Sequence, residues 1–134
     1  MVCLYCGAET AVTNSRHQKR PNQVWRRRKC LGCGAVFTTN ESVDYGSVWR
    51  VRGPKGRLEP FSSQKLVLSL LRSLEHRKTA LNDAVGLSQT LIARLRPLFK
   101  DGVADAAAIT KAAQVALNRF DKVASVHYGA HHRG

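Results

Sequence analysis

The sequence is short of acidic residues and of long apolar runs. No apolar run approaches the roughly 18 residues that a membrane-spanning helix requires, so we expect no such helix. The first ten residues lack the basic head and apolar core of a secretory signal, so we expect no signal peptide. Asp and Glu total 9 against 22 Lys and Arg, which gives a formal net charge of +13. This charge argues against a neutral metabolic enzyme and favours a polyanionic partner, such as DNA, RNA, nucleotide phosphates or an anionic membrane surface.

The motifs of common enzyme classes are missing as well. The sequence has neither the GxxxxGK[ST] motif of a P-loop nor the GxGxxG motif of a Rossmann site. It shows no paired carboxylates, no nucleophile beside a base and no open metal site. Four histidines lie in or near the expected helices, and we interpret them as solvent-exposed or as adventitious metal binders: His76, His127, His131 and His132. We therefore predict that the protein is not an enzyme.

Cysteine is absent after residue 33. The four cysteines form two CxxC motifs, Cys3 with Cys6 and Cys30 with Cys33. Two such motifs favour a structural Zn²⁺ site in a reducing cytoplasm, because four thiolates close the coordination sphere. Redox-active pairs or plain buried thiols are the alternative, but neither motif is followed by the helical pattern typical of a redox CxxC. His17, between the motifs, is expected at the surface.

Each CxxC motif is followed directly by a glycine. Gly7 and Gly34 permit the positive φ that such a metal-binding turn, or knuckle, requires. The 23 residues between Cys6 and Cys30 leave room for a β-hairpin, which is typical of a zinc ribbon. This part has few large apolar side chains, so we expect it to depend on the metal for stability.

The pattern changes near residues 44–46. Before this boundary we expect short strands and turns, and after it a β-hairpin followed by helices, which together make an α+β fold. We expect Ser62 or Ser63 to cap the first helix and Pro97 to kink or end the second. The expected elements are strands at 11–13 and 35–39, a hairpin of 48–51 and 57–59 around a turn at 53–56, and helices from residue 62 or 63, at 82–100, at 105–119 and at 122–131.

Apolar residues recur at helical spacing in the second part. About 85 residues with four helices and a hairpin suffice to bury one core. The predicted core stripes are Leu66, Leu70 and Leu74 in the first helix, then Leu81, Val85, Ser88, Ile92, Leu95 and Phe99 in the second, and Ile109, Ala113, Ala116 and Phe120 in the third.

A basic run leads into the second CxxC motif. Its residues are Trp25, Arg26, Arg27, Arg28 and Lys29, and Arg16, Lys19 and Arg20 precede it. On an extended strand, Arg26 and Arg28 face one way while Arg27 and Lys29 face the other. Adjacent charges on a small module repel one another unless a polyanion compensates, so we predict nucleic-acid binding. A solvated charge run is the alternative.

A second group of cations surrounds the turn of the expected hairpin. Arg52, Lys55, Arg57 and Lys65 are placed to neutralise phosphates, and the N-terminus of the following helix adds its dipole. Taken alone, such a hairpin is more often only an element of the fold.

Two groups of motifs follow one another along the chain. The first group is the two CxxC motifs, Asn14-Ser15-Arg16, the Arg-rich run and Phe37-Thr38-Thr39-x-Glu41. The second group is the V-x-[KR] strand, Gly56-Arg57, Glu59-Pro60-Phe61, Lys65-Leu66 and Phe120-Asp121-Lys122-Val123-Ala124. The first group resembles the zinc ribbon of the NrdR repressors of bacterial ribonucleotide reductase genes, and the second group resembles an ATP-cone.

The resemblance implies a zinc-ribbon DNA-binding domain at residues 1–45 and a nucleotide-sensing ATP-cone at residues 46–134. The regulator it implies is cytoplasmic and nucleoid-associated. It binds paired promoter boxes in double-stranded DNA, senses ATP and dATP, forms homo-oligomers through the cone and has no membrane partner. The implied DNA-binding residues are Ser15, Arg16, Trp25, Arg26, Arg27, Arg28 and Lys29. The implied nucleotide-binding residues are Val51, Arg52, Lys55, Arg57, Glu59, Lys65 and Arg72.

The chain departs from the family pattern at several positions. In the hairpin, Gly53 stands where the family has Lys, and near the C-terminus Ser125 stands where the family has Tyr.

The alternative function is that of a constitutive zinc-ribbon protein, which binds RNA or the ribosome without sensing nucleotides.

Overall fold

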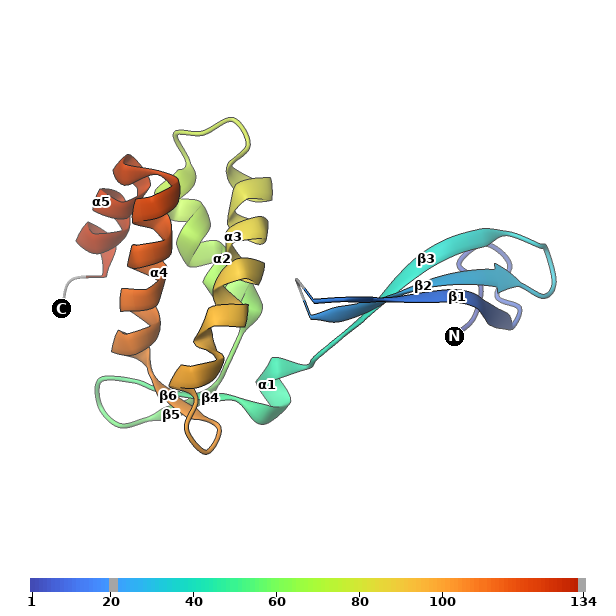
Figure 1. Cartoon of the computed structure of the whole chain (residues 1–134), viewed down its shortest axis with the longest axis horizontal. Helices are drawn as coiled ribbons and strands as arrows, with labels where there is room; N and C mark the ends of the chain where they lie inside the picture. Colours follow the sequence, from blue (N-terminus) through green and yellow to red (C-terminus); the bar gives the residue numbers. More distant parts are fainter. Residues whose placement is uncertain (20–21, 133–134) are drawn as a thin grey trace. The chain divides into compact units, whose positions relative to one another are not determined.

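The computed structural model describes residues 1–19 and 22–132, and Arg20 of the basic segment lies outside them. The chain divides into two compact units, Met1–Val43 and Asp44–Gly134, which are labelled by element in Figure 1. Among the described residues, no helix has both the length and the apolar character needed to span a membrane.

The first unit is a three-stranded antiparallel sheet in the order β1-β2-β3. Its strands are β1 (Thr10–Gln18), β2 (Gln23–Cys30) and β3 (Val36–Ser42). β1 extends five residues beyond the predicted 11–13, because its polar second half pairs with the basic strand β2. The hairpin expected between the two CxxC motifs is therefore present, and its hydrogen bonds run across residues that lack a strand-like apolar pattern.

The second unit opens with a short helix and a small sheet. α1 (Tyr45–Val48) replaces the start of the strand expected at 48–51, and the amide of Trp49 closes the helical turn by donating to the Tyr45 carbonyl, 2.8 Å away. β4 (Arg50–Arg52) then pairs antiparallel with β5 (Leu58–Pro60), so the hairpin itself is confirmed but begins two residues later.

A third strand, β6 (Val103–Asp105), pairs parallel with β4 and completes the order β5-β4-β6. The sequence analysis does not predict β6. Three residues carry too little periodicity to indicate a strand, and the partner strand lies about 50 positions earlier in the chain, so only the tertiary fold brings the two together.

Four helices cover the rest of the unit, and all four are predicted. Ser62 caps the first one, because its Oγ accepts a hydrogen bond from the amide of Lys65 at 3.2 Å. The second helix ends early, as predicted, where Pro97 lies in the 3-10 helix η1 (Arg96–Leu98). The helix bounds are α2 (Ser63–Leu74), α3 (Ala80–Leu95), α4 (Ala106–Phe120) and α5 (Lys122–His131).

The core of the second unit corrects part of the predicted stripes. Leu66, Leu70 and Leu74 are buried as expected. In α3, however, Leu81 and Val85 are exposed, and Ala84 and Leu91 are buried with Ser88 and Leu95. Successive residues of a helix are about 100° apart around its axis. At the N-terminal end of α3, the buried face is therefore rotated by one residue position from the predicted face.

The buried face of α4 differs in the same way. Phe120 lies partly in solvent, and Leu117 is buried instead. The guanidinium of Arg77 covers the Phe120 ring, 4.6 Å from its centroid. The cation above the ring compensates for its exposure.

Aromatic side chains fix the small sheet to the helices. The ring of Trp49, just before β4, stacks on Phe99 at a centroid distance of 4.1 Å. Phe61, just after β5, contacts both rings edge to face at 5.6 and 5.9 Å. Edge-to-face and offset-stacked geometries are the favourable ones for aromatic pairs. This cluster holds β4 and β5 beside the N-terminus of α2, where the pocket described below lies.

Candidate functional site

The four cysteine sulfurs come together at one end of the first unit. All four lie within 4.8 Å of one another. The distance between the sulfurs of Cys3 and Cys33 is 3.8 Å, and that between the sulfurs of Cys6 and Cys30 is 3.4 Å. Four thiolates around Zn²⁺ at about 2.3 Å form a tetrahedron with edges of about 3.8 Å, so the observed cluster fits a structural zinc site.

The backbone of the two knuckles prepares the thiolates. Gly7 and Gly34 have φ of 77° and 75°, which confirms the positive φ predicted for both. In the second knuckle the amides of Cys33 and Gly32 each donate to the Cys30 sulfur at 3.3 Å. Donation from Cys33 is the main reason that the pKa of the Cys30 thiol falls to about 6. Since the thiolate is the form that binds zinc, these amides favour metal binding at Cys30. At Cys33 the amide of Ala35 lowers the pKa, but the hydrogen bond with Cys30 and burial outweigh it and raise the pKa to about 11.

The basic strand β2 presents different partners on its two faces. Arg26 donates to Ser15 Oγ at 3.0 Å and forms an ion pair with Glu41 at 3.4 Å. Arg28 donates from Nη1 to Thr10 Oγ1 at 3.3 Å, and its Nε is buried with no hydrogen-bond partner among the described residues. Both arginines are therefore engaged with the sheet itself.

The other face of β2 carries Trp25, Arg27 and Lys29. The guanidinium groups of Arg16 and Arg27 each lie 6.0 Å from the centroid of the Trp25 ring. Arg27 and Lys29 are exposed. The seven residues implied as DNA contacts thus divide between two faces of one sheet, in the alternation expected for an extended strand.

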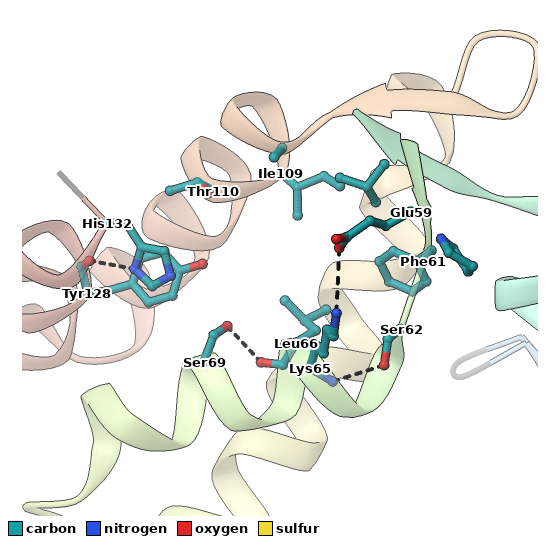
Figure 2. A pocket seen from close by; sticks show the side chains of 13 residues that line it. Glu59, Phe61, Ser62, Lys65, Leu66, Ser69, Ile109, Thr110, Tyr128 and His132 are labelled. Atoms are coloured by element: carbon teal, nitrogen blue, oxygen red, sulfur yellow. Dashed lines mark hydrogen bonds and ion pairs between the residues drawn. The ribbon is translucent and has the colours of Figure 1, made fainter. Parts of the chain in front are cut away.

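A pocket of about 200 Å³ lies in the second unit between the small sheet, α2, α4 and α5. Figure 2 shows Glu59 and Lys65 at one side and Tyr128 and His132 at the other, with apolar walls between them. The Glu59 carboxylate and the Lys65 ammonium are 3.5 Å apart. The lining residues are Val51, Glu59, Pro60, Phe61, Ser62, Lys65, Leu66, Ser69, Ala106, Ile109, Thr110, Tyr128 and His132.

The structure places the residues implied for nucleotide binding in different positions. Val51, Glu59 and Lys65 line the pocket together. Arg52 points to Asp105 on the neighbouring strand, with 3.5 Å between the charged groups. Three further cations are outside the pocket lining: Lys55 and Arg57 at the hairpin turn, and Arg72 in the last turn of α2.

Sequence reasoning missed the residues that close the pocket. Tyr128 is buried, which raises the pKa of its phenol, while Ser69 and Thr110 act in the opposite direction. The ring of His132 stacks on Tyr128 at 3.9 Å, and its Nδ1 lies 2.9 Å from the Tyr128 carbonyl. The interpretation of His132 as only a solvent-exposed tail residue is therefore incomplete. The spacing of the two residues, four positions apart on a helix, is the signal that indicates this contact.

Comparison with known proteins extends this picture to the whole chain. Residues 1–41 match the family model described as "Transcriptional repressor NrdR-like, N-terminal domain". Three proteins named "Transcriptional repressor NrdR" are among the relatives. The one from Symbiobacterium thermophilum is 33% identical over 133 residues, with 99% of this chain and 87% of the relative covered. The one from a Psychrobacter species is 32% identical (99% and 86% covered), and the one from Fervidobacterium nodosum is 30% identical (97% and 84% covered).

These relatives are named as repressors, which is a regulatory role and not an enzymatic one, as the sequence analysis predicts. The match spans both units and is not confined to the cysteine-bearing one. The chain therefore belongs to the NrdR family of transcriptional repressors, with a zinc ribbon at its N-terminus.

Proposed function

We propose that the protein is a zinc-dependent, nucleotide-responsive repressor of ribonucleotide reductase genes that acts in the cytoplasm, at the nucleoid. The zinc ribbon binds paired promoter boxes in double-stranded DNA, and ATP or dATP in the second unit sets the oligomeric state of the chain. The observation that carries this proposal is the presence in one chain of a basic sheet with a four-cysteine cluster that fits zinc and a separate pocket lined by the N-terminus of a helix.

Charge supports the DNA-binding part. The formal charge of +13 provides the electrostatic attraction that dominates affinity for a phosphate backbone. The basic strand β2 is hydrogen-bonded to a strand on each side, so its cations are presented at defined positions. One ribbon offers few such contacts, and a stable complex requires two or more ribbons held together.

The pocket supports the nucleotide-binding part. Ser62 and Lys65 lie at the first turn of α2, where free amides and the helix dipole favour an anion. Val51, Phe61 and Ile109 provide apolar walls for a flat base. Hydroxyl groups of Thr110 and Tyr128 line the pocket and offer hydrogen bonds to the polar edge of a ligand, while the Ser69 hydroxyl donates to the Leu66 carbonyl at 2.9 Å and retains its acceptor capacity.

Thermodynamic coupling between nucleotide binding in the second unit and DNA binding by the first unit regulates repression. A nucleotide that prefers one cone–cone arrangement shifts the population towards it by its difference in affinity for the two arrangements. The arrangement of cones then sets the spacing of the ribbons. Only an assembly with the correct spacing holds both DNA boxes at once.

Light-scattering size chromatography tests this proposal on zinc-loaded protein without nucleotide, with ATP and with dATP. We expect the mass to change with the nucleotide, and DNA binding to follow the mass. If the mass is unchanged and calorimetry on the same samples shows no heat of binding, the nucleotide-responsive part fails. The chain is then a constitutive zinc-ribbon nucleic-acid binder, with RNA or the ribosome as the alternative partner.

A further inference from the structure

The register of the ribbon assigns its side chains to two faces. Residues directly opposite one another on antiparallel strands share a face. One set of opposed residues is Arg16, Trp25 and Asn40, and the next is Asn14, Arg27 and Thr38. Together with Lys29, these residues form what we call the tryptophan face. Arg26 lies opposite Ser15 and Thr39 and, with Arg28 and Glu41, forms the opposite face, here called the glutamate face.

The two faces differ in how their cations are neutralised. On the glutamate face, Arg26 is paired with Glu41 and bonded to Ser15, and the exposed fraction of its side chain is 31%. On the tryptophan face, no carboxylate of the described residues lies within 4.0 Å of Arg16, Arg27 or Lys29. Three cations on one face of a small sheet repel one another, and a bound polyanion relieves this repulsion.

Trp25 gives the tryptophan face a defined geometry. The guanidinium groups of Arg16 and Arg27 each lie 6.0 Å from the centroid of its ring. Contacts of this kind restrict where the two long side chains extend. Both arginines are therefore held close to the same ring, so less conformational freedom is lost when they engage phosphates.

Amide side chains on the same face add hydrogen-bonding groups. Asn40 lies opposite Trp25, Asn14 lies opposite Arg27, and both are exposed. An asparagine amide donates and accepts at once, which is the combination that reads the edge of adenine in the major groove. Cations for phosphates and amides for base edges are the two kinds of contact that sequence-specific DNA binding requires.

We propose that the tryptophan face is the surface that binds double-stranded DNA, and that the glutamate face does not contact it. Arg16, Arg27 and Lys29 contact phosphates, while Asn14 and Asn40 contact base edges. The assignment rests on the proposed function, since it presupposes that the ribbon binds DNA. It narrows the family-implied set by removing Ser15, Arg26 and Arg28 from the contacts and adding the two asparagines.

The test compares three substitutions in β2 that each remove one positive charge, two on the tryptophan face and one on the glutamate face. Zinc-loaded full-length protein is titrated with a labelled mixed-sequence DNA duplex at several salt concentrations, and fluorescence anisotropy gives the affinity. Each lost phosphate contact lowers the magnitude of the slope of log K against log salt by about 0.9. We expect this loss for Arg27→Gln and for Lys29→Gln, and an unchanged slope for Arg26→Gln.

Arg26→Gln also removes contacts within the sheet, so its zinc content and circular dichroism are compared with those of the unsubstituted protein. If the Arg26→Gln variant fails to bind zinc, the Ser15→Ala variant is tested in its place, because this substitution alters the glutamate face without changing the charge. An equal or larger loss of slope for Arg26→Gln, or a loss of DNA affinity for Ser15→Ala, overturns the assignment of the face.

The other outcomes separate this inference from the proposed function. If the unsubstituted protein binds the duplex in a salt-dependent way but Arg27→Gln keeps its slope, the face assignment fails and DNA binding stands. If the unsubstituted protein binds no duplex even at low salt, both fail. A single-stranded RNA of the same sequence that binds more tightly than the duplex overturns double-stranded DNA as the partner of this face.

Discussion

Gly34 provides the left-handed backbone conformation with which the second knuckle ends. Its φ of 75° lies in the left-handed region, and a Cβ at this position would meet no atom within 4 Å. The constraint on Gly34 is thus conformational and not steric. An L-residue with a side chain pays for the left-handed region through a clash of its own Cβ with the backbone.

Substitution Gly34→Ala is expected to weaken zinc binding by about 1–2 kcal/mol, which is roughly a tenfold loss in affinity. Competition with a chromophoric chelator measures this change. Gly86→Ala is the matched control, because Gly86 lies inside α3 with open space around its Cβ position. The control is expected to stabilise the second unit by about 0.5–1 kcal/mol and to leave zinc affinity unchanged. Equal zinc affinity of Gly34→Ala and the unsubstituted protein would contradict the argument.

At the scale of elements, α5 is the helix that joins the pocket to the rest of the second unit. At its C-terminal end, Tyr128 and His132 line the pocket. At its N-terminal end, Asp121 Oδ1 accepts from the amide of Ala124 at 3.1 Å and caps the helix. The Oδ2 atom of the same carboxylate lies 2.9 Å from His76 Nε2 and 3.1 Å from Arg77 Nη1, at the end of α2.

The hydrogen bond with His76, and then the capping amide of Ala124, hold the pKa of Asp121 well below its usual range. A carboxyl group with a lowered pKa in the folded state adds stability that is complete above its unfolded pKa of about 3.9 and disappears as the pH falls further. The contribution of Asp121 to folding is therefore fully present at neutral pH and lost in acid.

We expect Asp121→Asn to lower the thermal midpoint of the second unit at pH 7. Asparagine caps helices as well as aspartate does, so the substitution removes the charge and retains the cap. The difference from the unsubstituted protein is expected to shrink steadily as the pH falls from about 5 towards 2. Thermal melts followed by circular dichroism at several pH values measure this. A difference that is constant over the whole range would show that the carboxylate charge is not the cause.

At the scale of the molecule, the two units depend on different sources of stability. Among the described residues of the first unit, the buried hydrophobic side chains are Cys3 and Cys30. The second unit has a continuous core of leucines, alanines and aromatic residues from all four long helices. We therefore expect a metal at the four cysteines to stabilise the first unit, whereas hydrophobic burial stabilises the second.

Zinc removal is therefore expected to unfold the first unit alone. Titration with a strong chelator should abolish DNA binding and the β-sheet signal, while the helical circular dichroism and nucleotide binding persist. Addition of Zn²⁺ in excess should restore the ribbon. Loss of the helical signal at the same chelator concentration would show that the second unit requires the metal as well.

The sequence by itself determined the features that depend on neighbouring residues. The spacing of the cysteines and the glycine after each pair specify the knuckles, since the metal geometry and the positive φ act within a few positions. Ser62 begins α2 through a bond to an amide three residues later, and Pro97 ends α3 because its ring removes a helical donor. These interactions are local, so the pattern of residues suffices to predict them.

Only the tertiary structure decided the features that depend on distant partners. β6 is a strand because β4 lies beside it, and the buried face of α3 is set by its packing on α2. The basic strand β2 has one arginine paired with a carboxylate because Glu41, on the next strand, reaches Arg26 and not Arg27. The pocket closes when α5 brings Tyr128 and His132 to residues more than 60 positions earlier. Neither register nor burial across such separations is encoded in any short stretch of sequence, and the site emerges only when the chain packs.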